Sequence, residues 1–168
     1  MINIYSINTI RFIVAVLLQV VIMDNIQFSG YINPFFYIIF ILLLPFETPN
    51  WFLLLLAFIL GFSIDLLNGI PGMHASACVF MAFLRPFVLK NFSPHDGYET
   101  GTIPCISHYG IEWFAKYTLI LVLAHSVFLF YIESFSFIDF FHTLVRVILS
   151  TTFTATIIII SQFFIFRK

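Results

Sequence analysis

Six long runs of apolar residues follow one another along the chain, separated by short polar or turn-forming segments. A helix that crosses a bilayer needs about 20 predominantly apolar residues, with a range of about 17–25. The runs predict six transmembrane helices, over about residues 7–26, 31–46, 51–67, 72–90, 113–132 and 143–166. They leave room for little else, so we expect a single multi-pass, all-α membrane domain over 1–168, with one polar loop at 91–112.

Two prolines bound the second of these runs. Pro34 suits the first position of a helix, and Pro45 marks the point where a helix would end. The sequence therefore predicts a helical span between them.

The basic residues fall unevenly on the two sides of this arrangement. With the N-terminus inside, one side of the membrane carries Arg11, Arg85, Lys90, Lys116, Arg167 and Lys168, and the other carries only Arg146. Basic residues concentrate on the cytoplasmic side of membrane proteins. We therefore expect both termini in the cytoplasm, which also requires an even number of spans.

Composition limits the classes of function. The chain is 61% hydrophobic and 9% charged, whereas soluble domains carry about 25% charged residues. This excludes a soluble enzyme, a nucleic-acid binder with a basic face and a disordered tail. Cys78 and Cys105 are too few for a disulfide framework.

Asp65 is the most informative polar residue inside a predicted span. It follows Ala57 and Gly61 at intervals of four, so the three residues share one helix face, and Gly72 follows in the next turn. Small residues four apart allow a second helix to approach closely, which predicts a groove for helix packing or for a partner. An ionisable residue at membrane depth suggests function; the alternative is that Asp65 bonds the backbone of the turn at 68–72.

The charge of Asp65 needs compensation, because the C-terminal end of a helix disfavours an anion. His74 and Arg146 are expected at the same depth, and we predict that Asp65 contacts one of them. Arg85 is excluded because the fourth span carries it to the opposite side. The alternative for Arg146 is a side chain that extends to the water at the interface.

Other polar residues give weaker signals for chemistry. His108 and Glu112 have a spacing that could ligate a metal, but no further ligand stands nearby, and a solvated loop is favoured. Ser63 could act as an intramembrane nucleophile only if His125 served as its base, and nothing fixes that pairing. We expect no catalytic, metal or cofactor site, so the protein is predicted not to be an enzyme.

Several segments resemble the family of rod shape-determining proteins called MreD. The first are Leu17-Leu18-Gln19-Val20, Asp24-Asn25 and Asn33-Pro34, followed by Gly61-Phe62-Ser63-Ile64-Asp65 with the later Gly72. The turn at 45–49, Leu84-Arg85-Pro86 and Ser93-Pro94 look like its Bacteroidetes-type branch. The resemblance covers residues 10–100, and Ala57 stands where many members have Gly.

This resemblance implies a non-enzymatic, multi-pass subunit of the bacterial inner membrane. Such a subunit links a bitopic MreC-type protein, and through it the MreB-type cytoskeleton, to the peptidoglycan polymerase and transpeptidase of the elongation machinery. The family's bundle is similar to the substrate-binding subunits of energy-coupling-factor transporters, although a shared fold does not transfer activity.

Two functions follow as hypotheses. In the favoured one the protein is a scaffold, and the face of Ala57, Gly61 and Asp65 receives a partner's transmembrane helix. The alternative is the substrate-binding subunit of a small-molecule transporter, which needs a cavity with convergent polar groups on the outer side. The outer turns are short, so we expect them to supply few such groups.

Overall fold

The computed structural model describes residues 4–25, 32–70, 72–94, 97–99, 101–134 and 140–165. Within these ranges the chain is helical, with no strand. The elements are α1 (Ile4–Leu18), the π-helical turn η1 (Gln19–Met23), the 3₁₀ turn η2 (Phe36–Ile38), α2 (Ile39–Leu42), α3 (Asn50–Asn68), α4 (Met73–Asn91), α5 (Ile106–Ser134) and α6 (Phe140–Ile165).

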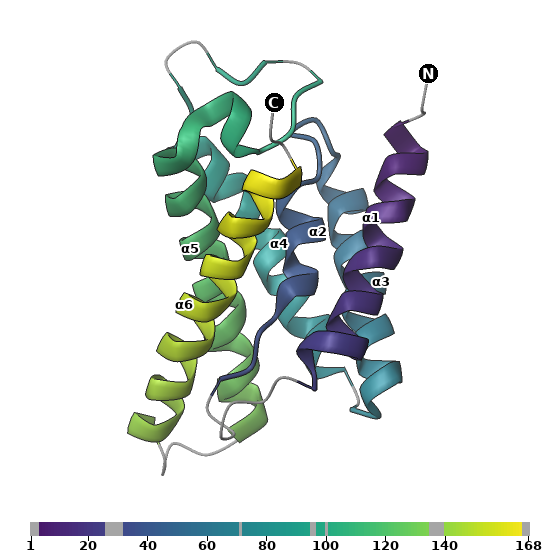
Figure 1. Ribbon diagram of the computed structural model, residues 1–168, viewed down its shortest axis with the longest axis vertical. Coiled ribbons are helices and arrows are strands. Elements are labelled where there is room, and N and C mark those ends of the chain that lie inside the picture. The colour runs from purple at the N-terminus through teal and green to yellow at the C-terminus, as the bar shows by residue number, and fades with distance from the viewer. Residues whose placement is uncertain are drawn as a thin grey trace.

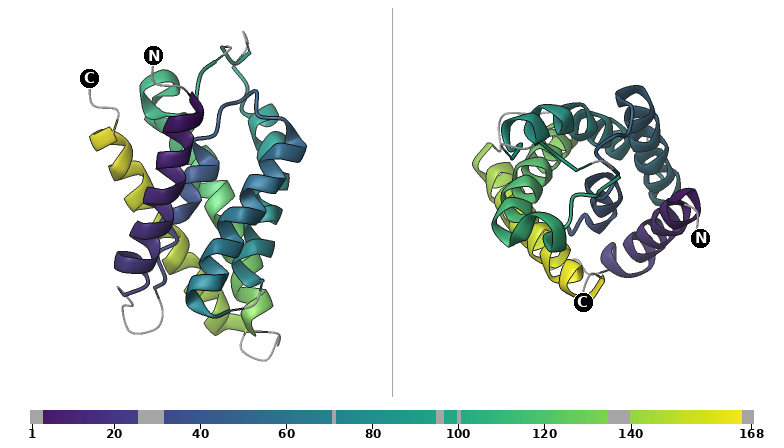
Figure 2. Two further views of the ribbon diagram at one scale, coloured as in Figure 1. Left: turned by 90° about the vertical axis from the view of Figure 1, so that its right-hand side faces the viewer. Right: turned by 90° about the horizontal axis from the view of Figure 1, so that it is seen from above.

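Five long helices form a ring around a short central one. In the view along the bundle, α1, α3, α4, α5 and α6 surround α2 (Figure 2). We call the end where α1 begins and α6 ends the upper end, and the opposite end, where α6 begins, the lower end (Figure 1). The helices α3, α4, α5 and α6 pack against one another in chain order.

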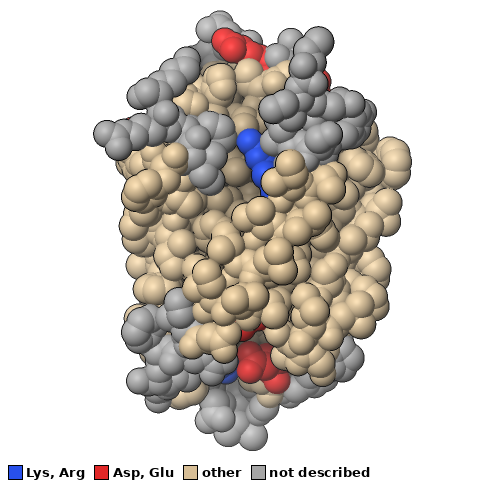
Figure 3. All heavy atoms as spheres, turned by 45° about the vertical axis from the view of Figure 1, so that its right-hand side comes forward, with Lys and Arg blue, Asp and Glu red and all other residues tan. Residues whose placement is uncertain are grey.

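The long helices have the length and composition of membrane spans. α3, α4, α5 and residues 140–164 of α6 each meet that description, and a shorter apolar helix covers Asn8–Met23. In Figure 3 a broad uncharged band separates the charged side chains near the two ends of the visible face. The chain is thus a multi-pass helical membrane protein, whereas the count of six spans and the side of the termini remain predictions.

The second predicted span is where the structure differs most from expectation. Of the described residues 32–46, only Phe36–Leu42 is helical, and residues 33–35 leading into it are not. We call residues 32–44 the central segment; every residue from Pro34 to Leu44 is buried. The prediction of a regular span is wrong here because this segment faces protein on all sides, and non-helical backbone is tolerated at membrane depth when protein encloses it.

α5 consists of two helices that meet at a kink. It starts at Ile106, but Gly110 is non-helical, with φ 80° and ψ 164°, and separates a short first helix from the long helix that continues to Ser134. A left-handed φ of this size is accessible to glycine without strain. The long helix of α5 therefore begins close to the predicted position, and the predicted polar segment at 91–112 contains the short helix before Gly110.

An aromatic cluster covers the upper end of the bundle. Tyr98 stacks on Phe46 with ring centroids 4.1 Å apart, and its hydroxyl donates to the Leu89 carbonyl at 2.7 Å. Burial raises the pKa of Tyr98 to about 12, so the hydroxyl keeps the proton that it donates. Trp113 donates its indole N–H to the Phe92 carbonyl at 2.9 Å. These bonds tie the loop after α4 to the bundle.

Candidate functional site

The face of Ala57 and Gly61 is filled by α4 of the same chain. Ala57 is fully buried, and a Cβ built on Gly61 would lie 2.5 Å from both the Cα of Ala75 and the carbonyl oxygen of His74. Real Cβ atoms do not approach backbone so closely. The expectation of close helix packing at these residues is met within the molecule, and the expectation that a partner's helix occupies the face is wrong.

Asp65 caps the first turn of α4. Its Oδ1 accepts from the backbone N–H of His74 at 3.0 Å and contacts His74 Nδ1 at 2.9 Å, while its Oδ2 accepts from the N–H of Ala75 at 2.9 Å. The first N–H groups of a helix lack partners within it, and Gly72, the N-cap residue, has no side chain to supply one. A buried carboxylate on α3 thus does the work of an N-cap for α4, where the helix dipole favours an anion.

Of the two charge partners expected for Asp65, His74 is the one that contacts it in the structure. Arg146 lies elsewhere: its Nη2 is 3.3 Å from Glu133 Oε1, and its guanidinium carbon lies 4.6 Å from the centre of the Phe130 ring. The Asp65–Arg146 contact is therefore wrong, and the physical reason is that α4 already supplies three donors to the Asp65 carboxylate.

Gln19 binds the non-helical start of the central segment. Its Nε2 donates to the Pro34 carbonyl at 2.8 Å and to Asp24 Oδ1 at 2.7 Å, and its Oε1 accepts from the Tyr37 N–H at 3.3 Å. Gln19 is 2% exposed. One side chain thus satisfies a donor and an acceptor of backbone that lacks helical partners.

Two hydroxyl groups of α6 bind the same stretch from the other side. Ser150 Oγ accepts from the N–H of Asn33, and Thr154 Oγ1 accepts from the N–H of Phe35, both at 3.0 Å. These two side chains of α6 therefore bind the backbone of the central segment.

The upper end of the central segment is held by a buried cation. Arg85 is 1% exposed; its Nη2 donates to the Leu44 carbonyl, and its Nε donates to the Tyr117 hydroxyl at 2.9 Å. Tyr117 in turn donates to the Leu42 carbonyl at 3.1 Å. The sequence analysis placed Arg85 among the cytoplasmic charges and did not predict this role, although its position inside an apolar run was the signal for it.

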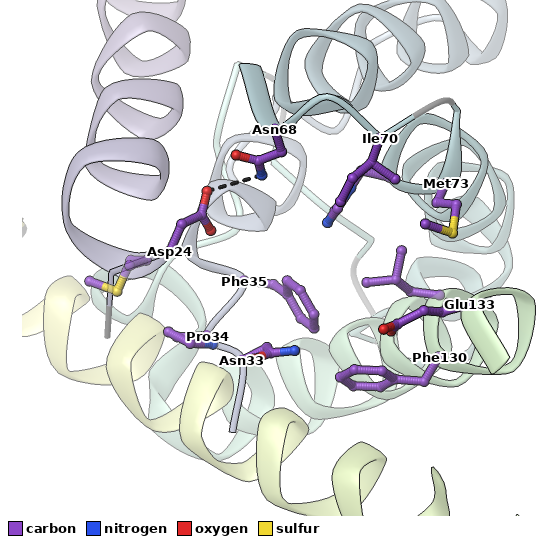
Figure 4. Close-up of a pocket in the computed structure, with 12 residues that line it drawn as sticks. Asp24, Asn33, Pro34, Phe35, Asn68, Ile70, Met73, Phe130 and Glu133 are labelled. Carbon is purple, nitrogen blue, oxygen red and sulfur yellow. Dashed lines mark hydrogen bonds between the residues drawn. The ribbon is translucent and has the colours of Figure 1, made fainter. Parts of the chain in front are cut away.

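A cavity of about 410 Å³ opens at the lower end of the bundle. Its wall includes the polar residues Asp24, Asn33, Asn68, His74 and Glu133, together with Phe35. Figure 4 shows Asp24 and Asn68 joined by a hydrogen bond, which is 3.1 Å long, with Glu133 across the opening from them. Polar side chains from several elements thus converge at this end of the bundle.

The weaker candidates are not brought together. Ser63 Oγ donates to the Ile59 carbonyl of its own helix at 2.7 Å, whereas His125 Nε2 contacts the Tyr37 hydroxyl at 2.8 Å. The Ser63–His125 pairing that an intramembrane hydrolase needs is therefore not formed. Glu112 pairs instead with Lys116 at 2.7 Å, and the described residues contain no cluster of three or more His, Cys, Asp or Glu around a common point.

Comparison with models of protein families, with curated proteins and with solved structures finds no match to this chain. The site geometry and the sequence resemblance are therefore the grounds for assigning a function.

Proposed function

We propose that the protein is a non-catalytic scaffold subunit of the bacterial cell-elongation machinery, placed in the inner membrane with its upper end in the cytoplasm. In this role it joins a bitopic MreC-type protein, and through it the MreB-type cytoskeleton, to a peptidoglycan polymerase and transpeptidase. The sequence resemblance supplies the identity of these partners. The observation that supports a docking role is a groove on the outer surface of α4.

This groove, which we call the α4 groove, has a floor of small residues between two aromatic walls. Its floor is formed by Gly72, Ala75, Ser76 and Val79, and it encloses about 640 Å³. One wall contains the stacked rings of Phe58 and Phe62, 5.6 Å apart, and the other contains Phe80 stacked on Phe128, 4.5 Å apart.

A transmembrane helix is the occupant that fits such a groove. In lipid there is no hydrophobic force between helices, so their association depends on close van der Waals packing over small residues. The chain already uses this device where Gly61 receives α4. A partner's helix with a bulky apolar stripe would fill the floor of the α4 groove and contact both aromatic walls.

The substitution Val79→Phe tests the α4 groove by filling its floor. Val145→Phe is the matched control, because Val145 is 47% exposed on α6, outside the α4 groove. The tagged full chain would be purified from its own membranes in mild detergent, and the recovery of a bitopic protein and of a wall synthase would be measured. We expect Val79→Phe to reduce this recovery by about tenfold and Val145→Phe to leave it unchanged.

Equal recovery with both variants would contradict docking at the α4 groove. A change in self-association with Val79→Phe, without a change in partner recovery, would assign the groove to a second copy of the chain. Gly61→Leu is not a test of docking, because its side chain would collide with the backbone of α4 and disrupt the fold itself.

The lower-end cavity favours a second candidate function, the substrate-binding subunit of a small-molecule transporter. Small-molecule sites are commonly concave, of about 300–1,000 Å³, with a few convergent polar groups. The cavity has about 410 Å³ and several polar side chains in its wall. Co-purification of an ATPase module in place of a wall synthase would support this function over the scaffold.

A further inference from the structure

The lower-end cavity is assembled from distant parts of the chain. The end of η1, the start of the central segment, the connection from α3 to α4 and the last turns of α5 all contribute to its wall. Asp24 and Asn68 lie on one side of the opening, and Glu133 lies on the other (Figure 4). A ligand there would contact several elements at once.

The charge of the cavity wall is one-sided. Asp24 and Glu133 are acidic, and no Lys or Arg is among the described residues of the wall. The Asp24 carboxylate accepts from the side-chain amides of Gln19 at 2.7 Å and of Asn68 at 3.1 Å. These donors are neutral, so they orient the carboxylate without compensating its charge. Glu133 has a cation beside it, because Arg146 lies 3.3 Å away outside the wall.

His74 also lines the same wall. Its Nδ1 lies 2.9 Å from Asp65 Oδ1, which accepts from the His74 backbone N–H as well. The polar wall thus combines the Asp24 carboxylate, which has no Lys or Arg beside it among the described residues, with a second carboxylate and an imidazole ring.

Apolar side chains complete the cavity. Phe35, Met73, Leu129 and Phe130 line it beside the polar groups. They provide contact area for a short carbon skeleton, while the acidic groups attract positive charge and repel anions.

We propose that the lower-end cavity is a binding site for a small organic cation, with a primary ammonium group of the ligand beside Asp24. This inference is independent of the scaffold role. It deepens the second candidate function, because it names the ligand class that a transporter subunit with this cavity would bind.

Three compounds with the same five-carbon skeleton test the charge requirement: 1,5-diaminopentane, 1,5-pentanediol and glutarate. Binding to the full chain in lipid nanodiscs would be measured by equilibrium dialysis, with diamines of three to seven carbons to vary the length. We expect saturable binding of at least one diamine, at least about tenfold weaker binding of the matching diol, and none of the matching dicarboxylate. Absence of saturable binding by every diamine, or equal binding of the diol, overturns the proposal.

The variant Asp24→Asn tests the assigned residue. It removes the charge and keeps an oxygen that can accept from Gln19 or Asn68, so we expect diamine affinity to fall by at least about tenfold. The control is Glu112→Gln, because Glu112 is an exposed carboxylate of α5 outside the cavity, paired with Lys116. Equal effects of the two variants overturn the assignment, and the comparison of diamine with diol on the unmodified protein remains decisive if Asp24→Asn does not fold.

The outcomes for the two sites are separable. Loss of partner recovery in Val79→Phe concerns the α4 groove, whereas diamine binding concerns a cavity to which Val79 does not contribute. Diamine binding without an ATPase partner would support the cavity as a site and reject the transporter.

Discussion

Two polar regions of this membrane protein differ in what their side chains contact. Around the central segment, Gln19, Thr154 and Arg85 each bond to backbone groups that lack helical partners. In the lower-end cavity, by contrast, the carboxylate of Asp24 bonds only to side-chain amides among the described residues, and Glu133 is 41% exposed beside Arg146. The side chains of the first region supply hydrogen-bond partners to backbone groups and so stabilise the fold, whereas the carboxylates of the second region can still accept hydrogen bonds from a ligand.

The difference shows how to interpret a polar residue inside a transmembrane segment. A backbone group without a partner is costly in an apolar environment, so side chains that supply the partner are needed for folding alone. Asp65 belongs to this class despite its charge, because both of its oxygens accept backbone N–H groups of α4. The identity of the bonded group, more than depth or charge, separates structural from ligand-binding residues.

Arg85→Met should have the largest effect on stability. It leaves the Leu44 carbonyl without its buried donor and removes the donor to the Tyr117 hydroxyl. Because each unsatisfied buried group costs about 1–3 kcal/mol, we expect the free energy of unfolding to fall by about 3 kcal/mol or more. Unfolding in mild detergent, followed by intrinsic fluorescence, would measure this loss.

Arg146→Met is the matched control for that experiment. The Arg146 side chain is 18% exposed and contacts a partly exposed Glu133, and such pairs contribute about 0–1 kcal/mol. Equal losses in the two variants would show that the central segment does not depend on a buried cation.

Asp65→Asn should have an intermediate effect. The amide has one acceptor oxygen where the carboxylate has two, so either His74 or Ala75 loses the partner of its N–H. We expect the free energy of unfolding to fall by about 1–3 kcal/mol. Ser63→Ala on the same helix removes only a bond within α3 and should change stability by less than about 0.5 kcal/mol. A stable Asp65→Asn protein would mean that α4 does not need this cap.

Much of the helical arrangement could be predicted from the sequence because lipid imposes a length and a composition on each span. The boundaries of α3 and α4 lie within one residue of the predicted 51–67 and 72–90. The spacing of Gly61 and Asp65 likewise predicted a close helix contact. The structural alternative for Asp65 placed its hydrogen bonds in the turn at 68–72, whereas its carboxylate accepts from the N–H groups of His74 and Ala75.

The predictions that failed are those that depended on which parts of the protein an element contacts. The central segment is as apolar as a true span, so hydropathy cannot reveal that it is enclosed by the ring and only partly helical. For the same reason the occupant of the Gly61 face could not be identified, since small residues attract a helix of the same chain as readily as one of a partner. The cavity was missed because its wall joins Asp24, Asn68 and Glu133, which no spacing rule connects.

The sharpest test of the comparison separates two residues that are bonded to each other, Gln19 and Asp24. Asp24 accepts a hydrogen bond from Gln19 at 2.7 Å, yet only Gln19 continues to the backbone of the central segment, at Pro34 and Tyr37. Gln19→Leu leaves both of those backbone groups without a partner and should cost about 2 kcal/mol or more, whereas Asp24→Asn keeps one acceptor and should cost less than about 1 kcal/mol. The same unfolding measurements, combined with diamine binding, should therefore separate the two variants: Asp24→Asn should be close to the unmodified protein in stability but deficient in binding, whereas Gln19→Leu should be deficient in stability. If Asp24→Asn were the less stable of the two, Asp24 would belong with the residues that hold the fold, and the cavity would lose the group that defines its ligand.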